Sequence, residues 1–160
     1  MKALVVYYSL EGNTRLMAET IAATLGADLL ELKPIDDINP GGFMKYVWGG
    51  RQVVKKKKPE LTPLAKNPQD YDFIILGTPV WAWSFTPALR SFFDQVKLTG
   101  KKVALFCCHG GGKAKTLELM KAELAGNQVV AETDFLEPAS QNKELNLAKA
   151  AEWAKLITSL

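Results

Sequence analysis

Short, continuously apolar segments recur along the chain, and they alternate with segments in which apolar residues are three or four positions apart. Uninterrupted apolar runs of this kind are typical of strands that are covered on both faces of a sheet. We predict five strands, of which the second is the weakest. They lie at residues 3–8, 28–32, 73–77, 102–108 and 128–135.

Helical spacing is clearest in four segments, each of which places several apolar residues on one face. A helix at 14–25 carries Met17, Ile21 and Leu25 and ends at Gly26. Another has Thr86 as its N-cap and Pro87 as its first residue, with Leu89, Phe92, Phe93 and Val96 on one face. A third helix is marked by Leu117, Met120 and Leu124. A last helix at 142–160 has Leu147, Ala150, Ala154 and Ile157 on one face.

The connection at residues 33–70 differs from the rest of the chain because it is rich in proline and glycine. It carries at most one helix, around residues 43–55. We interpret it as an insertion over the edge or rim of the sheet and not as a second domain.

Strands that alternate with helices imply right-handed crossovers, and hence an α/β fold with an open, doubly wound parallel sheet and helices on both faces. Ligands bind to such sheets beyond the carboxyl ends of the strands, where the strand order reverses. The loops at residues 8–14, 77–86 and 108–115 are therefore the candidate binding loops.

Composition and charge restrict the number of domains, the cellular compartment and the kinds of partner that we expect. A chain of 160 residues, 48% of them hydrophobic, is expected to form one domain over 1–160, and it has no apolar run long enough to cross a membrane. Cys107 and Cys108 are adjacent, so in a strand they point to opposite faces and are expected to be reduced thiols of a cytoplasmic protein. The net charge is +3, and the lysine run at 55–58 is expected to be a solvated surface that binds neither nucleic acid nor a membrane.

The first loop has the composition of a phosphate site. Ser9, Asn13 and Thr14 offer hydroxyl and amide groups, Gly12 permits close approach of the backbone, and the helix that follows directs its unpaired N–H groups toward the loop. An ordinary capped turn would have the same residues. Neither a Walker A loop nor a Gly-x-Gly-x-x-Gly fingerprint occurs in the chain, which disfavours nucleoside triphosphates and NAD bound in the usual way.

The other two loops suit a flat, conjugated ligand. GTPVWAWSFTP at 77–87 places Trp81, Trp83 and Phe85 just after a buried strand, where aromatic side chains can stack on a planar ring. CCHGGGK at 107–113 has three successive glycines, whose bare peptide groups can lie against a polar ligand edge or can simply make the loop flexible.

Together these segments resemble the flavodoxin family, in its short-chain form. Residues 9–14 (SLEGNT) are similar to the family's phosphate loop Ser/Thr-x-Thr-Gly-x-Thr, GTPVWAW to the loop that packs an aromatic ring against the flavin, and CCHGGG to the loop at the pyrimidine edge. The resemblance implies a five-stranded sheet of order 2-1-3-4-5 and a non-covalently bound FMN cofactor. The cofactor-binding residues that it implies are Ser9, Leu10, Glu11, Gly12, Asn13, Thr14, Thr78, Pro79, Val80, Trp81, Ala82, Trp83, Cys108, His109, Gly110, Gly111 and Gly112.

The chain departs from the family's pattern in three ways. Glu11 stands where relatives have threonine, so this carboxylate is expected to point away from the phosphate or to be screened. The loop after the fourth strand lacks the usual outer aromatic, for which Trp83 or Trp48 could substitute. The expected flavin rim is basic with few carboxylates, so we expect acidic redox partners and, if His109 takes up a proton, a second reduction potential less negative than in acidic flavodoxins.

Two functions remain open at this point. The first is a small FMN-dependent electron-transfer protein that shuttles electrons between partner proteins, as a monomer or weak homodimer. The second is an oxidoreductase of the NAD(P)H:quinone reductase type, which would need an open flavin face. A receiver-type signalling domain is disfavoured because Tyr7, Tyr8 and Ser9 stand where its acidic residues would be, and neither a metal site nor a hydrolytic nucleophile is expected.

Overall fold

The fold is built on one parallel β-sheet, seen in a computed structural model that describes residues 1–39, 41 and 44–160. All pairings are parallel and the order is β2-β1-β3-β4-β5, so the predicted fold class is confirmed. The strand order reverses at β1, which pairs with β2 on one side and with β3 on the other. The strands are β1 (Ala3–Tyr7), β2 (Asp28–Glu31), β3 (Phe73–Pro79), β4 (Lys102–His109) and β5 (Gln128–Leu136).

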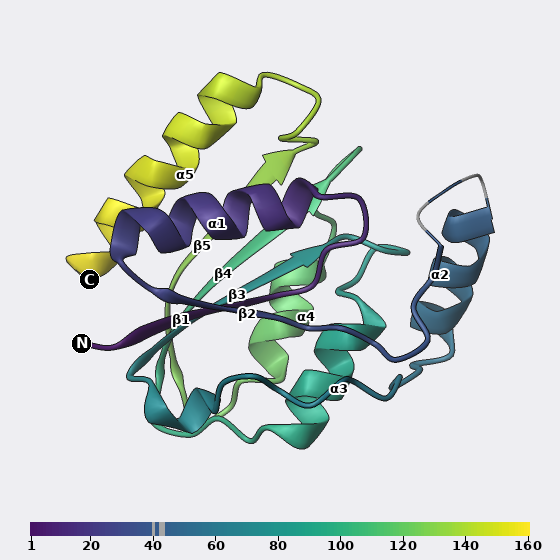
Figure 1. The fold of residues 1–160 in the computed structure, drawn as a ribbon, viewed down its shortest axis with the longest axis horizontal. Coiled ribbons are helices and arrows are strands. Elements are labelled where there is room, and N and C mark those ends of the chain that lie inside the picture. The colour runs from purple at the N-terminus through teal and green to yellow at the C-terminus, as the bar shows by residue number, and fades with distance from the viewer. Residues whose placement is uncertain (40, 42–43) are drawn as a thin grey trace.

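Helices cover both faces of this sheet (Figure 1). One layer holds α1 and α5, and the other holds α3 and α4, whereas α2 lies apart, beyond the carboxyl ends of the strands. The helices are α1 (Asn13–Leu25), α2 (Met44–Val54), α3 (Pro87–Gln95), α4 (Thr116–Ala122) and α5 (Lys143–Thr158), with a short 3-10 helix at Pro68–Asp70 that the sequence did not predict. No helix among the described residues is long and apolar enough to span a bilayer.

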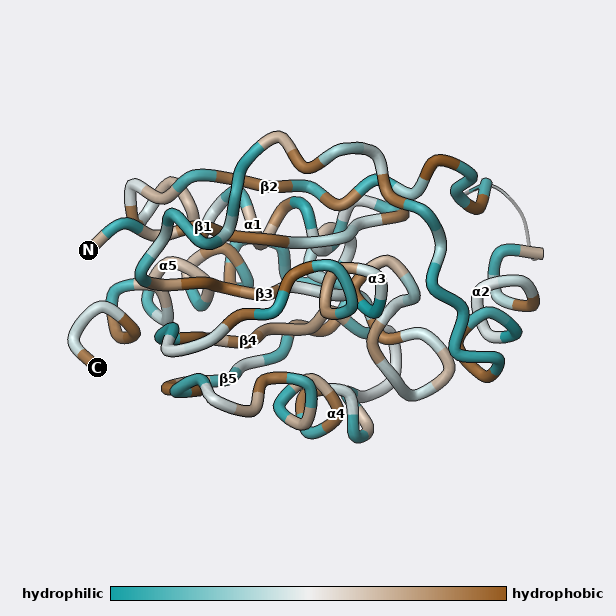
Figure 2. The backbone as a smooth tube through the Cα atoms, turned by 90° about the horizontal axis from the view of Figure 1, so that it is seen from below, coloured by the Kyte–Doolittle hydropathy of each residue, from teal (hydrophilic) through white to brown (hydrophobic). Residues whose placement is uncertain are grey.

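The sheet separates two apolar cores, and β4 contributes to both in strict alternation. Val103, Leu105 and Cys107 pack toward α3 and α4, while alternate residues such as Phe106 and Cys108 pack toward α1 and α5. In Figure 2, β3 and β4 run as largely brown, hydrophobic segments through the middle of the molecule, whereas the edge strands β2 and β5 are mixed in colour. The two cysteines are therefore on opposite faces, as predicted, and both are free thiols.

The predicted helix faces are largely confirmed. In α3, Leu89, Phe92 and Phe93 are buried, and Val96 follows the helix as its C-cap and is partly buried. In α5, Leu147 is only partly buried, whereas the other three predicted positions are fully buried.

One close approach ties β3 to β4. Gly77 lies opposite Phe106 in the register, and a Cβ atom built on Gly77 would lie 2.1 Å from Cζ of that phenyl ring. The ring in turn packs edge-on against Phe135 and Trp153, at centroid distances of 6.2 and 6.4 Å. Only a residue without a side chain fits at position 77.

Thr86 corrects one prediction. It occupies the N-cap position of α3, but its side chain makes no capping hydrogen bond. Its backbone N–H instead donates to Oγ1 of the buried Thr78, at 3.2 Å. Thr78 belongs to β3, which continues two residues beyond its predicted end because Thr78 and Pro79 still pair with β4.

The connection at 33–70 is closed at its base by backbone pairing. The N–H of Ile35 donates to the carbonyl of Glu60 at 2.9 Å, and the N–H of Thr62 donates to the carbonyl of Lys33 at 2.8 Å. Pro34 and Leu61 form an antiparallel bridge between them. The α-helix α2, inside the predicted range 43–55, lies beyond this base, past the carboxyl ends of the strands.

Candidate functional site

A pocket of about 210 Å³ opens at the carboxyl ends of β1, β3 and β4, where the three candidate loops meet. Twelve of the seventeen residues predicted to bind a cofactor line it, which shows that the loops converge as expected. They are Ser9, Leu10, Glu11, Asn13, Thr14, Pro79, Val80, Trp81, Ala82, Cys108, His109 and Gly110. Five more lining residues were not predicted: Lys45, Tyr46, Gly49, Gly50 and Glu137.

The five remaining predicted residues do not line the pocket. Gly12 and Thr78 instead support the loops through hydrogen bonds, and Trp83 is 76% exposed. Gly111 and Gly112 lie on the exposed part of the loop after β4.

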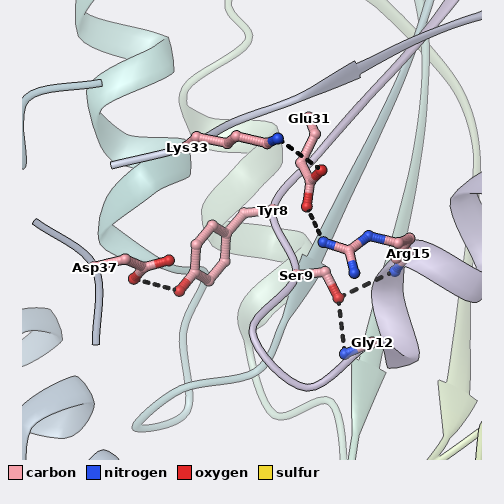
Figure 3. A network of polar contacts seen from close by, with 7 residues as sticks. All are labelled: Tyr8, Ser9, Gly12, Arg15, Glu31, Lys33 and Asp37. Atoms are coloured by element: carbon pink, nitrogen blue, oxygen red, sulfur yellow. Dashed lines mark hydrogen bonds and ion pairs between the residues drawn. The ribbon is translucent and has the colours of Figure 1, made fainter. Parts of the chain in front are cut away.

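Ser9 organises the loop between β1 and α1. Its Oγ accepts hydrogen bonds from the backbone N–H groups of Gly12 and Arg15, each at 3.2 Å (Figure 3). Both lone pairs of the hydroxyl are thereby used, so the proton of this hydroxyl is what Ser9 can offer to an anion. Gly12 has φ of 100°, a conformation that glycine adopts without strain.

The start of α1 leaves hydrogen-bond donors available at the pocket. The first intrahelical bond is donated by Leu16 to the carbonyl of Gly12 at 3.0 Å, so the N–H groups of Asn13 and Thr14 precede it. The Thr14 hydroxyl is buried and has no hydrogen-bond partner among the described residues, although Thr14 lines the pocket. A buried, unpaired hydroxyl beside the positive end of a helix fits a bound phosphate.

The Asn13 side chain connects two loops at the pocket. The oxygen of its side-chain amide accepts a hydrogen bond from the backbone N–H of Ala139 at 2.9 Å, which holds the loop after β5 against the first loop. That loop also brings Glu137 to the pocket. Nothing local in the sequence connects residues 13 and 139, which explains why Glu137 was missed.

Polar contacts behind the first loop fix its position (Figure 3). Arg15 pairs with Glu31 at the end of β2, and the Lys33 ammonium lies 3.8 Å from the same carboxylate. The Tyr8 hydroxyl donates to Asp37 at 2.8 Å. Burial, together with this carboxylate, raises the pKa of Tyr8 well above its usual value, so the phenol stays protonated.

The loop after β3 forms a tight turn that separates its two tryptophans. Trp81 and Ser84 exchange two backbone hydrogen bonds, at 2.9 and 3.0 Å, and both central residues have positive φ, 44° at Ala82 and 63° at Trp83. This is the geometry of a type I′ turn, built here without glycine. It places Trp81 at the pocket and leaves Trp83 on the surface, while Phe85 is buried in the apolar core. The prediction that all three aromatic residues stand at the mouth is therefore right only for Trp81.

Trp81 is held on two sides. Its ring lies edge-on to Tyr8, with centroids 5.4 Å apart and planes at 89°. A Cβ built on Gly49 of α2 would lie 3.1 Å from Cε3 of the indole, so α2 approaches this ring closely because residue 49 has no side chain.

Helix α2 supplies the residues that sequence reasoning overlooked. Lys45, Tyr46, Gly49 and Gly50 share one side of the helix and line the pocket, while Trp48 points elsewhere and lies 5.7 Å from the Arg51 guanidinium. The aromatic residue that α2 brings to the pocket is thus Tyr46, not Trp48. The spacing of these four residues, i, i+1, i+4 and i+5, is that of one side of a helix, and this is the pattern from which they could have been predicted.

His109 is held by hydrogen bonds on both ring nitrogens. Nε2 lies 2.7 Å from the Asp134 carboxylate, and Nδ1 accepts from the backbone N–H of Gly112 at 3.0 Å. The proton of the neutral ring is therefore on Nε2, because Nδ1 acts as the acceptor. Burial raises the pKa of Asp134, but His109 and the ammonium groups of Lys113 and Lys149 outweigh it, so this pKa lies below its ordinary value.

The charge around the pocket is less basic than expected. Two carboxylates, those of Glu11 and Glu137, line it together with Lys45, and Asp134 stands behind His109. The expectation of few carboxylates is therefore wrong, and with it the basis for a less negative second potential. The prediction that Glu11 is screened is confirmed, because it pairs with Lys45.

Neither cysteine is poised to react. Burial raises the pKa of both thiols to about 12, so both are neutral near pH 7. Cys108 is 3% exposed and acts as an apolar part of the pocket floor.

Comparison with known proteins agrees with these features. A family model described as Flavodoxin matches residues 2–154. A flavoprotein from Lactobacillus acidophilus, crystallised in complex with FMN, is 25% identical, with a TM-score of 0.72 over 89% of this chain and 97% of that chain. A flavoprotein structure from Bacteroides eggerthii is 22% identical, with a TM-score of 0.77 over 98% of each chain. Megasphaera elsdenii flavodoxin in its two-electron reduced form is 23% identical, with a TM-score of 0.58 over 96% of this chain and 99% of that one.

Proposed function

Because this chain belongs to the flavodoxin family and binds FMN, we propose that it is an electron carrier, whose flavin exchanges electrons with partner proteins and not with a bound substrate. FMN supplies the one- and two-electron chemistry, and the protein binds, orients and shields it. The extent of the family match carries this proposal. The Flavodoxin model covers residues 2–154 of the 160, so a nicotinamide or quinone would have to be bound by the same small domain that holds FMN.

The described residues divide the work of binding. The hydroxyl groups of Ser9 and Thr14 and the first N–H groups of α1 would hold the phosphate, and Trp81 would stack on the flavin ring. The loop after β4 would face the polar edge of the ring, and in this loop the His109 ring accepts a hydrogen bond from Gly112. Gly12, Thr78 and Gly112 support these loops from outside the pocket.

Anaerobic mixing of the FMN-loaded protein with NADH or NADPH tests the proposal. An electron carrier without a nicotinamide site should keep its oxidised flavin spectrum over many minutes, and dithionite should then reduce it at once. Prompt bleaching by either nicotinamide would instead establish the alternative, a reductase of quinones or similar acceptors.

The electron-transfer partner is proposed to be acidic. The outward side of α2 and the residues after it combine apolar and cationic side chains beside the pocket, a region that we call the α2 surface. Positive charge steers an acidic protein toward this rim, and exposed apolar groups then bury against it. The α2 surface consists of Met44, Val47, Trp48, Arg51, Val54, Lys55, Lys56 and Lys57, all of them exposed.

Small redox reagents of opposite charge test this steering. Oxidation of the reduced protein by anionic ferricyanide should slow by roughly tenfold as ionic strength rises, whereas oxidation by cationic hexaammineruthenium(III) should not slow. Replacing Lys55 and Lys57 by glutamate should reverse this preference, while Lys155→Glu at the far end of α5 should not. Equal rates for both reagents at low salt would contradict the proposal.

A further inference from the structure

Lys45 is the one lysine or arginine among the described residues that lines the pocket. Its side chain is 17% exposed, and its ammonium group pairs with the Glu11 carboxylate, whose side chain is 42% exposed. The hydrogen bond to Glu11 raises the pKa of Lys45, so the amine is charged at neutral pH. The pair joins α2 directly to the loop between β1 and α1.

This pair lies in a loop that must accept a phosphate dianion. Glu11 occupies the middle of the segment 9–14, so its carboxylate and the phosphate would repel each other at short range. An ammonium group between two anions is attracted to both, and the phosphate carries the larger charge. The flexible four-carbon stem of lysine allows the ammonium to exchange one partner for the other.

The position of Lys45 is fixed by its helix. Gly49, one turn further along α2, lies against the Trp81 ring, and Gly50 faces Ala82, so the middle of α2 is packed on the turn after β3. The lysines at 55–58 follow the helix and do not line the pocket. Lys45 is therefore held at the site by packing and is not one of several mobile surface cations.

We propose that Lys45 is a ligand of the FMN phosphate, and that Glu11 holds it in place until FMN binds. On binding, the ammonium group transfers from the carboxylate to the phosphate, and Glu11 turns toward solvent, which its exposure permits. Helix α2 thereby senses the phosphate, and the site discriminates FMN from riboflavin through a cation that a phosphate loop alone would not supply. The proposal depends on FMN binding but not on the electron-carrier function.

Titration of the apoprotein with FMN and with riboflavin, followed by quenching of flavin fluorescence, tests this. Lys45→Met should weaken FMN binding about tenfold and leave riboflavin binding unchanged, because only FMN carries the phosphate. Lys45→Arg should retain most of the FMN affinity. Lys57→Met, which removes a lysine outside the pocket, is the matched control and should bind both flavins as the wild type does.

Repeating the Lys45→Met substitution in a Glu11→Gln protein distinguishes two roles for Lys45. It could bind the phosphate directly, or it could only neutralise the charge of Glu11. If Lys45 binds the phosphate, Lys45→Met should still weaken FMN binding about tenfold in the Glu11→Gln protein. If Lys45 only screens Glu11, the loss should disappear in that background, and the proposal is overturned. Equal losses of FMN and riboflavin affinity would overturn it as well. Both outcomes leave the electron-carrier proposal standing.

Discussion

The Thr14→Val variant is expected to bind FMN about 10- to 100-fold more weakly than the wild type, while its apoprotein is at least as stable. The hydroxyl is buried without a hydrogen-bond partner in the described structure and has only the weakly polar Cys108 thiol as a noted polar neighbour, so its removal from the apoprotein sacrifices little and relieves a desolvation penalty. In the complex the same hydroxyl donates to a charged phosphate, a bond worth about 1.5–3 kcal/mol. The free energy of unfolding measured in urea should therefore stay the same or rise, while the FMN affinity measured by flavin titration should fall.

Thr116 provides a matched control for this variant. Its hydroxyl is also buried and unpaired among the described residues, and it opens α4, but it does not line the pocket. Thr116→Val should stabilise the apoprotein to a similar degree and leave FMN affinity unchanged. Riboflavin binding should be unaffected by either change. An FMN affinity that falls equally in both variants would show that Thr14 acts through folding and not through the phosphate.

Gly77→Ala is expected to give the largest loss of stability, about 3 kcal/mol. The new methyl group would lie 2.1 Å from Cζ of Phe106 and 2.5 Å from Cε1, well inside van der Waals contact. The ring cannot retreat freely because it packs against Phe135 and Trp153. Chemical denaturation of the apoprotein measures the loss as a shift in the midpoint.

Two further variants check the cause of that loss. Gly111→Ala adds the same methyl group in open space, and its unfolding free energy should stay within about 0.5 kcal/mol of the wild type. Phe106→Leu replaces the ring that the methyl group meets by a smaller side chain. The double variant should therefore lose less unfolding free energy than the sum of the losses in the two single variants. Strict additivity would rule out the steric explanation.

The sheet could be predicted from the sequence because its strands are short apolar runs with glycine and proline between them. The strand order came from the resemblance, since local patterns do not show which strands pair. Strand ends were less certain: β3 continues through Thr78 and Pro79 because β4 offers it a partner, which a local apolar pattern does not encode.

The pocket residues that lie close together in the sequence were predicted, and those that tertiary packing brings in from distant segments were missed. Residues 9–14 are one continuous segment, the loop after β1 and the start of α1, so Ser9 and Thr14 were found together. Glu137 enters through a hydrogen bond between Asn13 and Ala139, and α2 enters through the contact of Gly49 with Trp81, both of which depend on tertiary packing. The opposite directions of Trp81 and Trp83 follow from two positive φ angles without glycine, for which the sequence carries no turn signal.

The paired base of the connection at 33–70 has a consequence for how such a chain can diversify. Two backbone hydrogen bonds, at Ile35 and Thr62, close this excursion where it leaves the sheet, so neither apolar layer depends on its tip. Substitutions on the exposed side of α2 can therefore accumulate with little penalty to folding. The ligand and partner contacts that we propose for α2 would in this way be separated from the scaffold and could change without altering it.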